Sequence, residues 1–208
     1  MAASRPPANP KPKSASKSAR PVARPAHEVR IIGGQWKRTR LAVADKPGLR
    51  PTPDRVRETL FNWLGQDLTG WSCVDAFAGT GALGLEAASR GAAQVLLVEQ
   101  DAQLVDQLRR VQQRLAATTV NVQRGNGISL LQRLAPAATD LILIDPPFDA
   151  GLHEKALAAA APAVSAQGFI YLEAPTAWRE EQLAPFGLAL KRHMKAGAVH
   201  AHLLQRAS

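Results

Sequence analysis

The sequence contains one cysteine and no long apolar run, and these two absences exclude several classes of protein. Cys73 alone can form neither an internal disulfide nor a cysteine-based metal site. It lies in the apolar start of a predicted strand, so we interpret it as a small buried hydrophobic residue. No apolar stretch approaches the roughly 20 residues of a membrane helix, and no secretory segment stands near the N-terminus. We therefore expect a soluble, cytoplasmic protein with no membrane contact and no metal site.

Acidic residues are absent from positions 1–26, which hold six lysines and arginines. Positions 27–65 carry eight basic and four acidic residues, a net charge of +4. Because the whole chain carries +9, the remaining positions 66–208 have a net charge of −1. A polyanion should therefore meet the N-terminal third first. Because residues 1–26 are rich in Pro, Ala, Ser and Lys, we expect a disordered basic tail. The alternative is a tail that only aids solubility.

Three regions follow from this composition: the tail at 1–26, an extension at 27–65 and a larger domain at 66–208. Within the extension, 29–43 reads as a β-hairpin with its turn at Gly33-Gly34 and a second strand from Gln35. Basic side chains interleaved with an aromatic ring can bind phosphates and stack on a base. The alternative is an edge strand whose charges prevent aggregation. These candidates are Trp36, Lys37, Arg38 and Arg40.

Residues 48–64 predict a loop and then a helix. Thr52 or Asp54 can cap this helix, and Pro53 suits its first turn. Beyond it, strands are expected at 71–78, 94–98, 120–123, 140–144 and 168–173, with helices between them. Asp101 is expected to cap the helix that runs to about Ala116. The segments 187–193 and 198–204 favour an antiparallel closing pair. The alternation predicts an α/β, Rossmann-like, mostly parallel sheet with a small N-terminal hairpin.

The pattern Gly-x-Gly-x-x-Gly at Gly79, Gly81 and Gly84 lies between a predicted strand and a helix, where glycines let a ligand approach the backbone. Glu99 ends the next strand and can accept hydrogen bonds from ribose hydroxyls. These features fit a dinucleotide or S-adenosylmethionine (SAM). Asp75 favours SAM, because its carboxylate suits an ammonium group and would repel a pyrophosphate. The same strand tip holds Phe77.

Asp145-Pro-Pro-Phe148 follows a buried apolar run, so a carboxylate stands at a strand end before a rigid turn. Methyl transfer to an exocyclic amine needs the nitrogen lone pair turned toward the methyl group. Asp145 and the carbonyl of Pro146 can hold the two N–H groups in that orientation. Pro147 helps to hold that carbonyl rigid, and Phe148 can stack on the base.

These motifs resemble those of class I SAM-dependent methyltransferases, and more narrowly of the bacterial 16S ribosomal RNA guanine-N2 methyltransferases, the RsmD family. The matching stretches begin at Arg30-Ile-Ile-Gly-Gly, Gly48-Leu-Arg-Pro-Thr, Asp75-Ala-Phe-Ala-Gly and Asp145-Pro-Pro-Phe. The resemblance implies methyl transfer from SAM to one guanine of 16S rRNA in the small subunit or its assembly intermediate. The implied cofactor contacts are Asp75, Phe77, Gly79, Gly81, Glu99, Gln100, Asn126 and Asp145. The implied RNA contacts are Arg30, Trp36, Lys37, Arg38, Arg40, Arg50, Arg55 and Arg57.

Three alternatives stay open at this point, and we expect a monomer in each. The chain could methylate an adenine or a protein glutamine, although it lacks room for a separate DNA-recognition domain. It could be an NAD-dependent oxidoreductase, but Tyr171 lies within a strand and the histidines form no catalytic motif. It could also be an RNA-binding relative without catalysis. For Asn126 the alternative is a plain turn residue.

Overall fold

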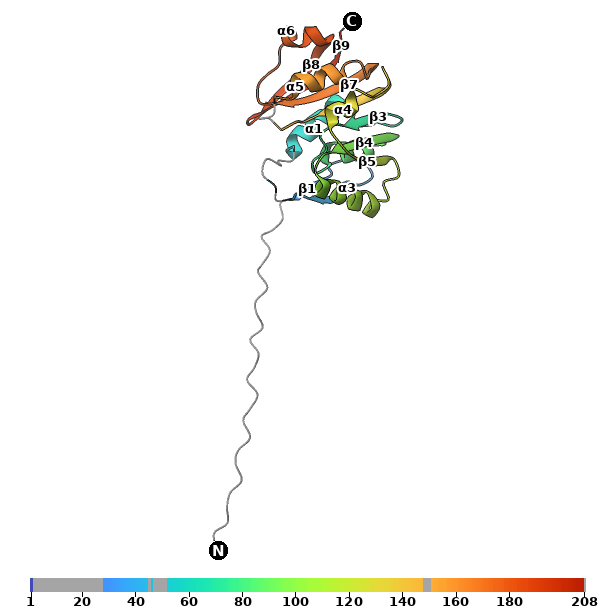
Figure 1. Ribbon diagram of the computed structural model, residues 1–208, viewed down its shortest axis with the longest axis vertical. Coiled ribbons are helices and arrows are strands. Elements are labelled where there is room, and N and C mark those ends of the chain that lie inside the picture. The colour runs from blue at the N-terminus through green and yellow to red at the C-terminus, as the bar shows by residue number, and fades with distance from the viewer. Residues whose placement is uncertain (2–27, 45, 47–51, 148–150, 208) are drawn as a thin grey trace.

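The computed structural model describes residues 1, 28–44, 46, 52–147 and 151–207. A seven-stranded sheet has the order β5-β4-β3-β6-β7-β9-β8, and a separate two-stranded sheet pairs β1 with β2 (Figure 1). The strands are β1 (Glu28–Arg30), β2 (Arg40–Ala42), β3 (Ser72–Asp75), β4 (Gln94–Glu99), β5 (Val120–Arg124), β6 (Thr139–Ile144), β7 (Val164–Ala174), β8 (Leu188–Ala196) and β9 (Val199–Arg206). The helices are α1 (Asp54–Trp63), α2 (Ala82–Ser89), α3 (Ala102–Arg114), α4 (Gly127–Leu131), α5 (His153–Ala160) and α6 (Glu180–Leu183), with a 3₁₀ turn at Ala184–Phe186.

Strand β6 lies at the middle of the large sheet, between β3 and β7. Its residues Leu141–Ile144 are all buried, as a strand covered on both faces requires. Strands β5, β4, β3, β6 and β7 run parallel, whereas β9 runs antiparallel to both of its neighbours, β7 and β8. The predicted α/β class, with its antiparallel closing pair, is confirmed.

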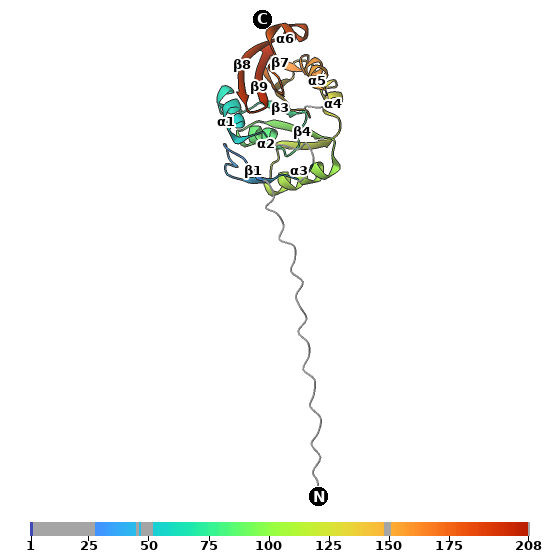
Figure 2. The ribbon, with the colours of Figure 1, turned by 90° about the vertical axis from the view of Figure 1, so that its left-hand side faces the viewer.

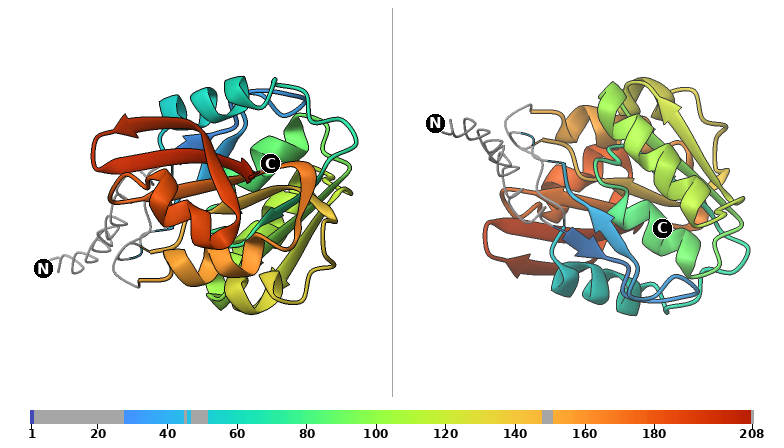
Figure 3. Two further views of the ribbon diagram at one scale, coloured as in Figure 1. Left: turned by 90° about the horizontal axis from the view of Figure 1, so that it is seen from above. Right: turned by 90° about the horizontal axis from the view of Figure 1, so that it is seen from below.

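Two apolar clusters cover the two faces of the sheet because alternate side chains of each strand point to opposite sides. Cys73 and Leu141 belong to the cluster that contains α1, α2 and α3. Val74 and Ile142 belong to the cluster that contains α4, α5 and α6. Figures 2 and 3 show helices on both sides of the sheet, so the carboxyl ends of the parallel strands remain at one open edge.

The N-terminal hairpin is shorter than the sequence suggested. Only three residue pairs join β1 to β2, and residues 33–38 form turns in place of the long second strand that we predicted from Gln35. The reason is a tertiary contact with α2. The amide of Gln35 donates to the Ser89 carbonyl at 2.8 Å, and the amide of Trp36 donates to Ser89 Oγ at 2.9 Å. These donors are therefore not available for strand pairing.

Helix α1 begins after Pro53, and no side chain caps it. The prediction that Thr52 or Asp54 caps this helix was wrong because both side chains bind other partners. Thr52 Oγ1 donates to Glu173, and the Asp54 carboxylate accepts from Arg57. Among the described residues, no helix is long and apolar enough to cross a membrane.

Candidate active site

The loop between β3 and α2 is built on glycines that other residues cannot replace without strain. Gly79 has a φ of 51° and Gly81 has a φ of 78°, both in the left-handed region. Gly84 packs its backbone against β4, and an added Cβ would lie 2.2 Å from Leu97 Cδ2. The spacing seen in the sequence thus gives a tight turn before α2 and a close helix–strand contact.

Asp75 is a buried carboxylate with spare accepting capacity. Its Oδ2 accepts from the Gly84 amide at 3.0 Å, whereas its Oδ1 has no hydrogen-bond partner among the described residues. Burial raises the pKa of Asp75 to about 7, against the backbone amides of Gly84 and Phe77, which lower it. An ammonium group beside Oδ1 would stabilise the ionised form and lower this pKa.

The Glu99 carboxylate lies at the end of β4 and fixes the glycine loop to the start of α3. Its Oε2 accepts from the Gly79 amide at 2.9 Å, and its Oε1 accepts from the Asp101 amide at 2.8 Å. Asp101 then caps α3 by accepting from Gln103 and Leu104, as α3's sequence pattern predicted. A carboxylate has about four accepting positions, so Glu99 keeps capacity for hydroxyl donors.

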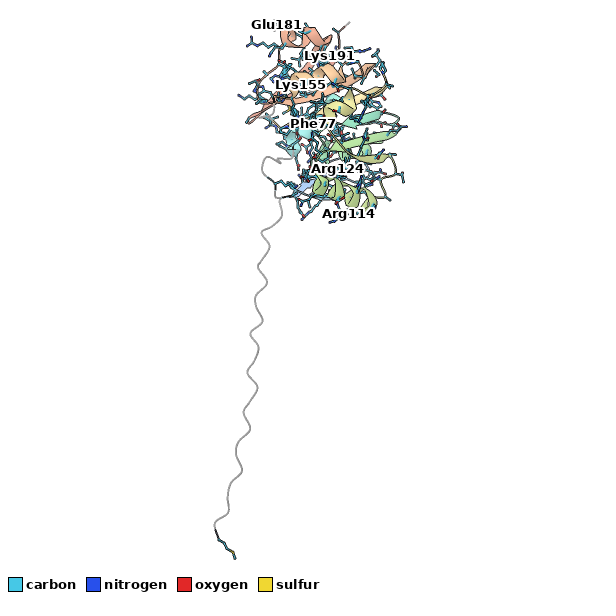
Figure 4. All side chains as sticks on the ribbon, viewed as in Figure 1. Phe77, Arg114, Arg124, Lys155, Glu181 and Lys191 are labelled. Atoms are coloured by element: carbon cyan, nitrogen blue, oxygen red, sulfur yellow. The ribbon has the colours of Figure 1, made fainter. Side chains whose placement is uncertain are left out.

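Three other candidate cofactor residues have different environments. Asn126 is exposed, and its Oδ1 caps α4 by accepting from the Ser129 amide at 2.9 Å. The side-chain oxygen of Asn126 therefore has the role of a turn residue, and its amide nitrogen takes no part in this hydrogen bond. Gln100 is exposed beside Glu99. Phe77 is half-buried against the second cluster and lies near the middle of the fold in Figure 4.

Asp145 directly follows β6 and is partly buried. Burial raises the pKa of its carboxyl group well above the ordinary value, and the charges of Glu173 and Asp75 raise it further. The three carboxylates therefore belong to one electrostatic group at the carboxyl edge of the sheet. Pro146 is buried and Pro147 exposed, while Phe148 lies outside the described residues.

Glu173 is a site residue that sequence reasoning missed. Ile144 pairs with Leu172 across β6 and β7, so the next residues lie side by side, Asp145 just after β6 and Glu173 near the end of β7. Glu173 Oε1 accepts from Thr52 Oγ1 at 2.7 Å and from the Tyr171 hydroxyl at 2.8 Å. Burial raises the pKa of Glu173, and these hydrogen bonds oppose the shift. The signal in the sequence was an acidic residue at the ends of two consecutive buried strands.

Arg57 does not face solvent, and its charge opposes the rise that burial causes in the pKa of the Glu173 carboxylate. Its side chain is 0% exposed and pairs with Glu86 at 3.2 Å and Asp54 at 2.6 Å. Its Nε donates to the Thr52 carbonyl at 3.1 Å. The expected RNA contact of Arg57 is therefore corrected to a structural role, because a buried, fully paired guanidinium has no access to a phosphate. Glu86, which also accepts from Ile32 and Gly33, was missed as well.

Comparisons with known proteins identify the family of this chain. The model of the family described as Conserved hypothetical protein 95 matches residues 29–205. Ribosomal RNA small subunit methyltransferase D of Escherichia coli K12 is 42% identical over 86% of this chain and 90% of its own length. This chain belongs to the RsmD family.

Solved structures support the RsmD assignment. The Escherichia coli protein yhhF is 40% identical, with a TM-score of 0.75 over 88% of this chain and 99% of that one. The Haemophilus influenzae protein HI0767 is 30% identical, with a TM-score of 0.72 over 88% and 100% of the two chains. A precorrin-6y C5,15-methyltransferase of Geobacter metallireducens, 18% identical with a TM-score of 0.62 over 81% and 94%, shares the fold.

The remaining RNA candidates of this RsmD member divide into paired and unpaired cations. Arg30 pairs with Asp54 at 2.8 Å and Arg40 with Glu28 at 3.0 Å, both near the surface. Three cations are exposed and join no ion pair among the described residues: Lys37, Arg38 and Arg55. Trp36 is half-buried against the first cluster. Arg50 lies outside the described residues, as does the predicted tail apart from Met1.

Proposed function

We propose that this protein transfers a methyl group from SAM to the exocyclic N2 of a guanine in 16S ribosomal RNA. The observation that supports the proposal most strongly is that strand register brings Asp145, at the end of β6, close to the buried carboxylates of Asp75 on β3 and Glu173 on β7. This group adjoins the glycine loop before α2, since Asp75 Oδ2 accepts from the Gly84 amide. The small-subunit rRNA methyltransferases named among the relatives support an rRNA substrate.

The cofactor residues fit SAM by the chemistry of their donors and acceptors. Bound SAM supplies an electrophilic methyl group and carries an ammonium and a ribose. Asp75 Oδ1, buried without a partner among the described residues, suits the ammonium. Glu99 suits the ribose hydroxyls, since both its oxygens are already held in place by backbone amides. Phe77, Gln100 and Asn126 stay assigned to the surroundings of the nucleoside.

We assign to Asp145 the role of orienting the guanine amine. Its carboxylate and the Pro146 carbonyl accept the two N–H groups of the guanine amine, so that the lone pair faces the methyl donor. Positive charge builds on nitrogen during transfer, and a carboxylate at this position stabilises it. Asp145 acts here as a hydrogen-bond acceptor that aims the amine rather than as a strong general base. Phe148 is proposed to stack on the base.

We further propose guanine 966 as the target, and the small subunit or an assembly intermediate as the substrate, acted on by a monomer. The test uses tritiated SAM and small subunits that lack the modification. Label at guanine N2 is expected, and label on another atom or on none would refute the proposal.

A matched pair of variants assigns the role of Asp145. Asp145→Asn is expected to lower transfer at least a hundredfold while SAM binding, measured by calorimetry, changes little. Asp106→Asn removes the same charge from an exposed position on α3 and should leave both measurements unchanged. Equal activity of the two variants would contradict the role given to Asp145.

A further inference from the structure

We propose that the hairpin tip, defined as residues 191–200 of β8 and β9, is a second surface that holds the RNA backbone beside the active site. The proposal rests on the proposed function, since it assumes an RNA substrate. It concerns the C-terminal part of a chain whose basic excess, counted along the sequence, lies in the N-terminal third.

The hairpin tip is strongly cationic. It contains Lys191, Arg192 and Lys195 and no acidic residue, and all three cations are exposed. None of them joins an ion pair within 28–44, 46, 52–147 and 151–207. Glu180, whose carboxylate accepts from the Leu190 amide at 3.1 Å, contacts β8 just before the tip begins. Unpaired, solvated cations can exchange their counterions for phosphates.

A β-bulge sets the arrangement of these cations. The pairing of β8 with β9 shifts between Leu190 and Arg192, so Lys191 is the extra residue. Before the bulge, Leu190 packs against the second apolar cluster, whereas Met194 beyond it packs against the first. Arg192 therefore projects on the same face as Met194, and Lys195 projects on the opposite face. The free edge of the sheet thus carries cations on both faces.

Strand register places the hairpin tip at the edge that holds the active site. Leu172 of β7 pairs with His202 of β9, and His202 pairs with His193 of β8. Asp145, Glu173, Ala201 and Met194 therefore lie at one level, on four neighbouring strands. At roughly 4.8 Å per strand, about 15 Å separate Met194 from Asp145. An RNA strand whose base reaches Asp145 extends more than about 15 Å from that point, so its backbone can reach the hairpin tip.

A row of imidazole rings adds a flat surface beside the cations. His193 and His200 stack with centroids 5.2 Å apart, and their Nε2 and Nδ1 atoms lie 3.0 Å apart. His193 also stacks on His202 at 4.8 Å, and the buried His202 accepts from the Trp178 amide at 3.0 Å. The three rings are thereby fixed to the sheet, and His193, which contacts both of the others, is exposed. A fixed planar ring suits stacking by an unpaired base.

The strands β8 and β9 lie toward one end of the fold, and the N-terminal hairpin lies at the other (Figure 2). Figure 2 shows β1 at one end and β8 and β9 at the other, with α1 between them. Figure 4 shows Lys191 at the end formed by β8, far from Arg114 on α3. An RNA that contacts both ends would therefore pass the carboxyl edge of the sheet, where Asp145 lies.

The test compares two double charge reversals in the full chain. Arg192→Glu/Lys195→Glu keeps the edge strand charged, so protection against aggregation is preserved while phosphate contact is reversed. The control, Arg110→Glu/Arg133→Glu, makes the same charge change at exposed positions on α3 and after α4. Affinity for unmodified 16S rRNA is measured between 50 and 200 mM salt, and SAM affinity is measured beside it.

The hairpin variant is expected to bind rRNA about tenfold more weakly than wild type and to lower the salt slope by about 1–2, with SAM affinity unchanged. The control should bind as wild type. Equal affinity and slope in the two variants would overturn the proposal. If the double variant fails to fold, Lys195→Gln alone carries the test, with an expected slope change of about 1. Failure of wild type to bind or methylate rRNA would instead refute the proposed function.

Discussion

Replacement of the buried Arg57 by methionine should cost about 2–3 kcal/mol of unfolding free energy. Breaking a buried ion pair typically costs about 3–5 kcal/mol, because a charge is left uncompensated. Here Glu86 keeps other donors: Arg90 at 2.8 Å and the amides of Ile32 and Gly33 at 2.8 and 2.7 Å. The Thr52 carbonyl loses its contact with Arg57, a further cost of about 1 kcal/mol. The retained partners of Glu86 reduce the ion-pair cost to about 1–2 kcal/mol, so the total is about 2–3 kcal/mol.

Urea unfolding measures this effect, with Arg55→Met as the control. With a slope of roughly 2 kcal/mol/M, the midpoint of Arg57→Met should fall by about 1 M at unchanged slope. Arg55 lies two positions earlier on α1 and is exposed, so Arg55→Met should change stability by less than about 0.5 kcal/mol. Equal midpoints for the two variants would show that the network around Glu86 does not depend on Arg57.

Two further substitutions test the glycine loop and a buried histidine. Gly84→Ala places a Cβ 2.2 Å from Leu97 Cδ2 and should cost about 1–3 kcal/mol. Gly125→Ala, which meets no atom within 4 Å, is its control in thermal unfolding, and similar melting temperatures would refute the packing argument. Burial lowers the pKa of His202 to about 4, below the unfolded value of about 6.5, so the unfolded chain binds the extra proton and stability falls as pH drops from 6.5 toward 4. Between pH 7 and 5 this loss is about 1–2 kcal/mol after allowance for nearby solvent. His202→Gln should lose less stability than wild type over this range in urea titrations, and an equal loss would assign the pH dependence to other groups.

Local patterns predicted most of the elements because each depends on neighbouring residues. Asp101 was predicted to cap the third helix, and it accepts two amide hydrogen bonds there. The predicted caps at Thr52 and Asp54 do not form because partners distant in sequence bind the same oxygens. Glu173 binds the Thr52 hydroxyl, and Arg30 binds the Asp54 carboxylate. The long second strand of the hairpin does not form for the same reason, since Ser89 accepts the amide hydrogen bonds that strand pairing would need.

The sequence by itself determined the α/β class, the glycine loop and the carboxylate at the end of the Leu141–Ile144 strand. Each depends on residue spacing along the chain: the alternation of strands and helices, the Gly-x-Gly-x-x-Gly pattern, and the proline pair after Asp145. Tertiary structure decided which side chains meet. It joined Thr52 to Glu173 and buried Arg57 against Glu86. The physical reason is that buried charges are stable only with partners, and partners far apart in sequence are set by strand order and register.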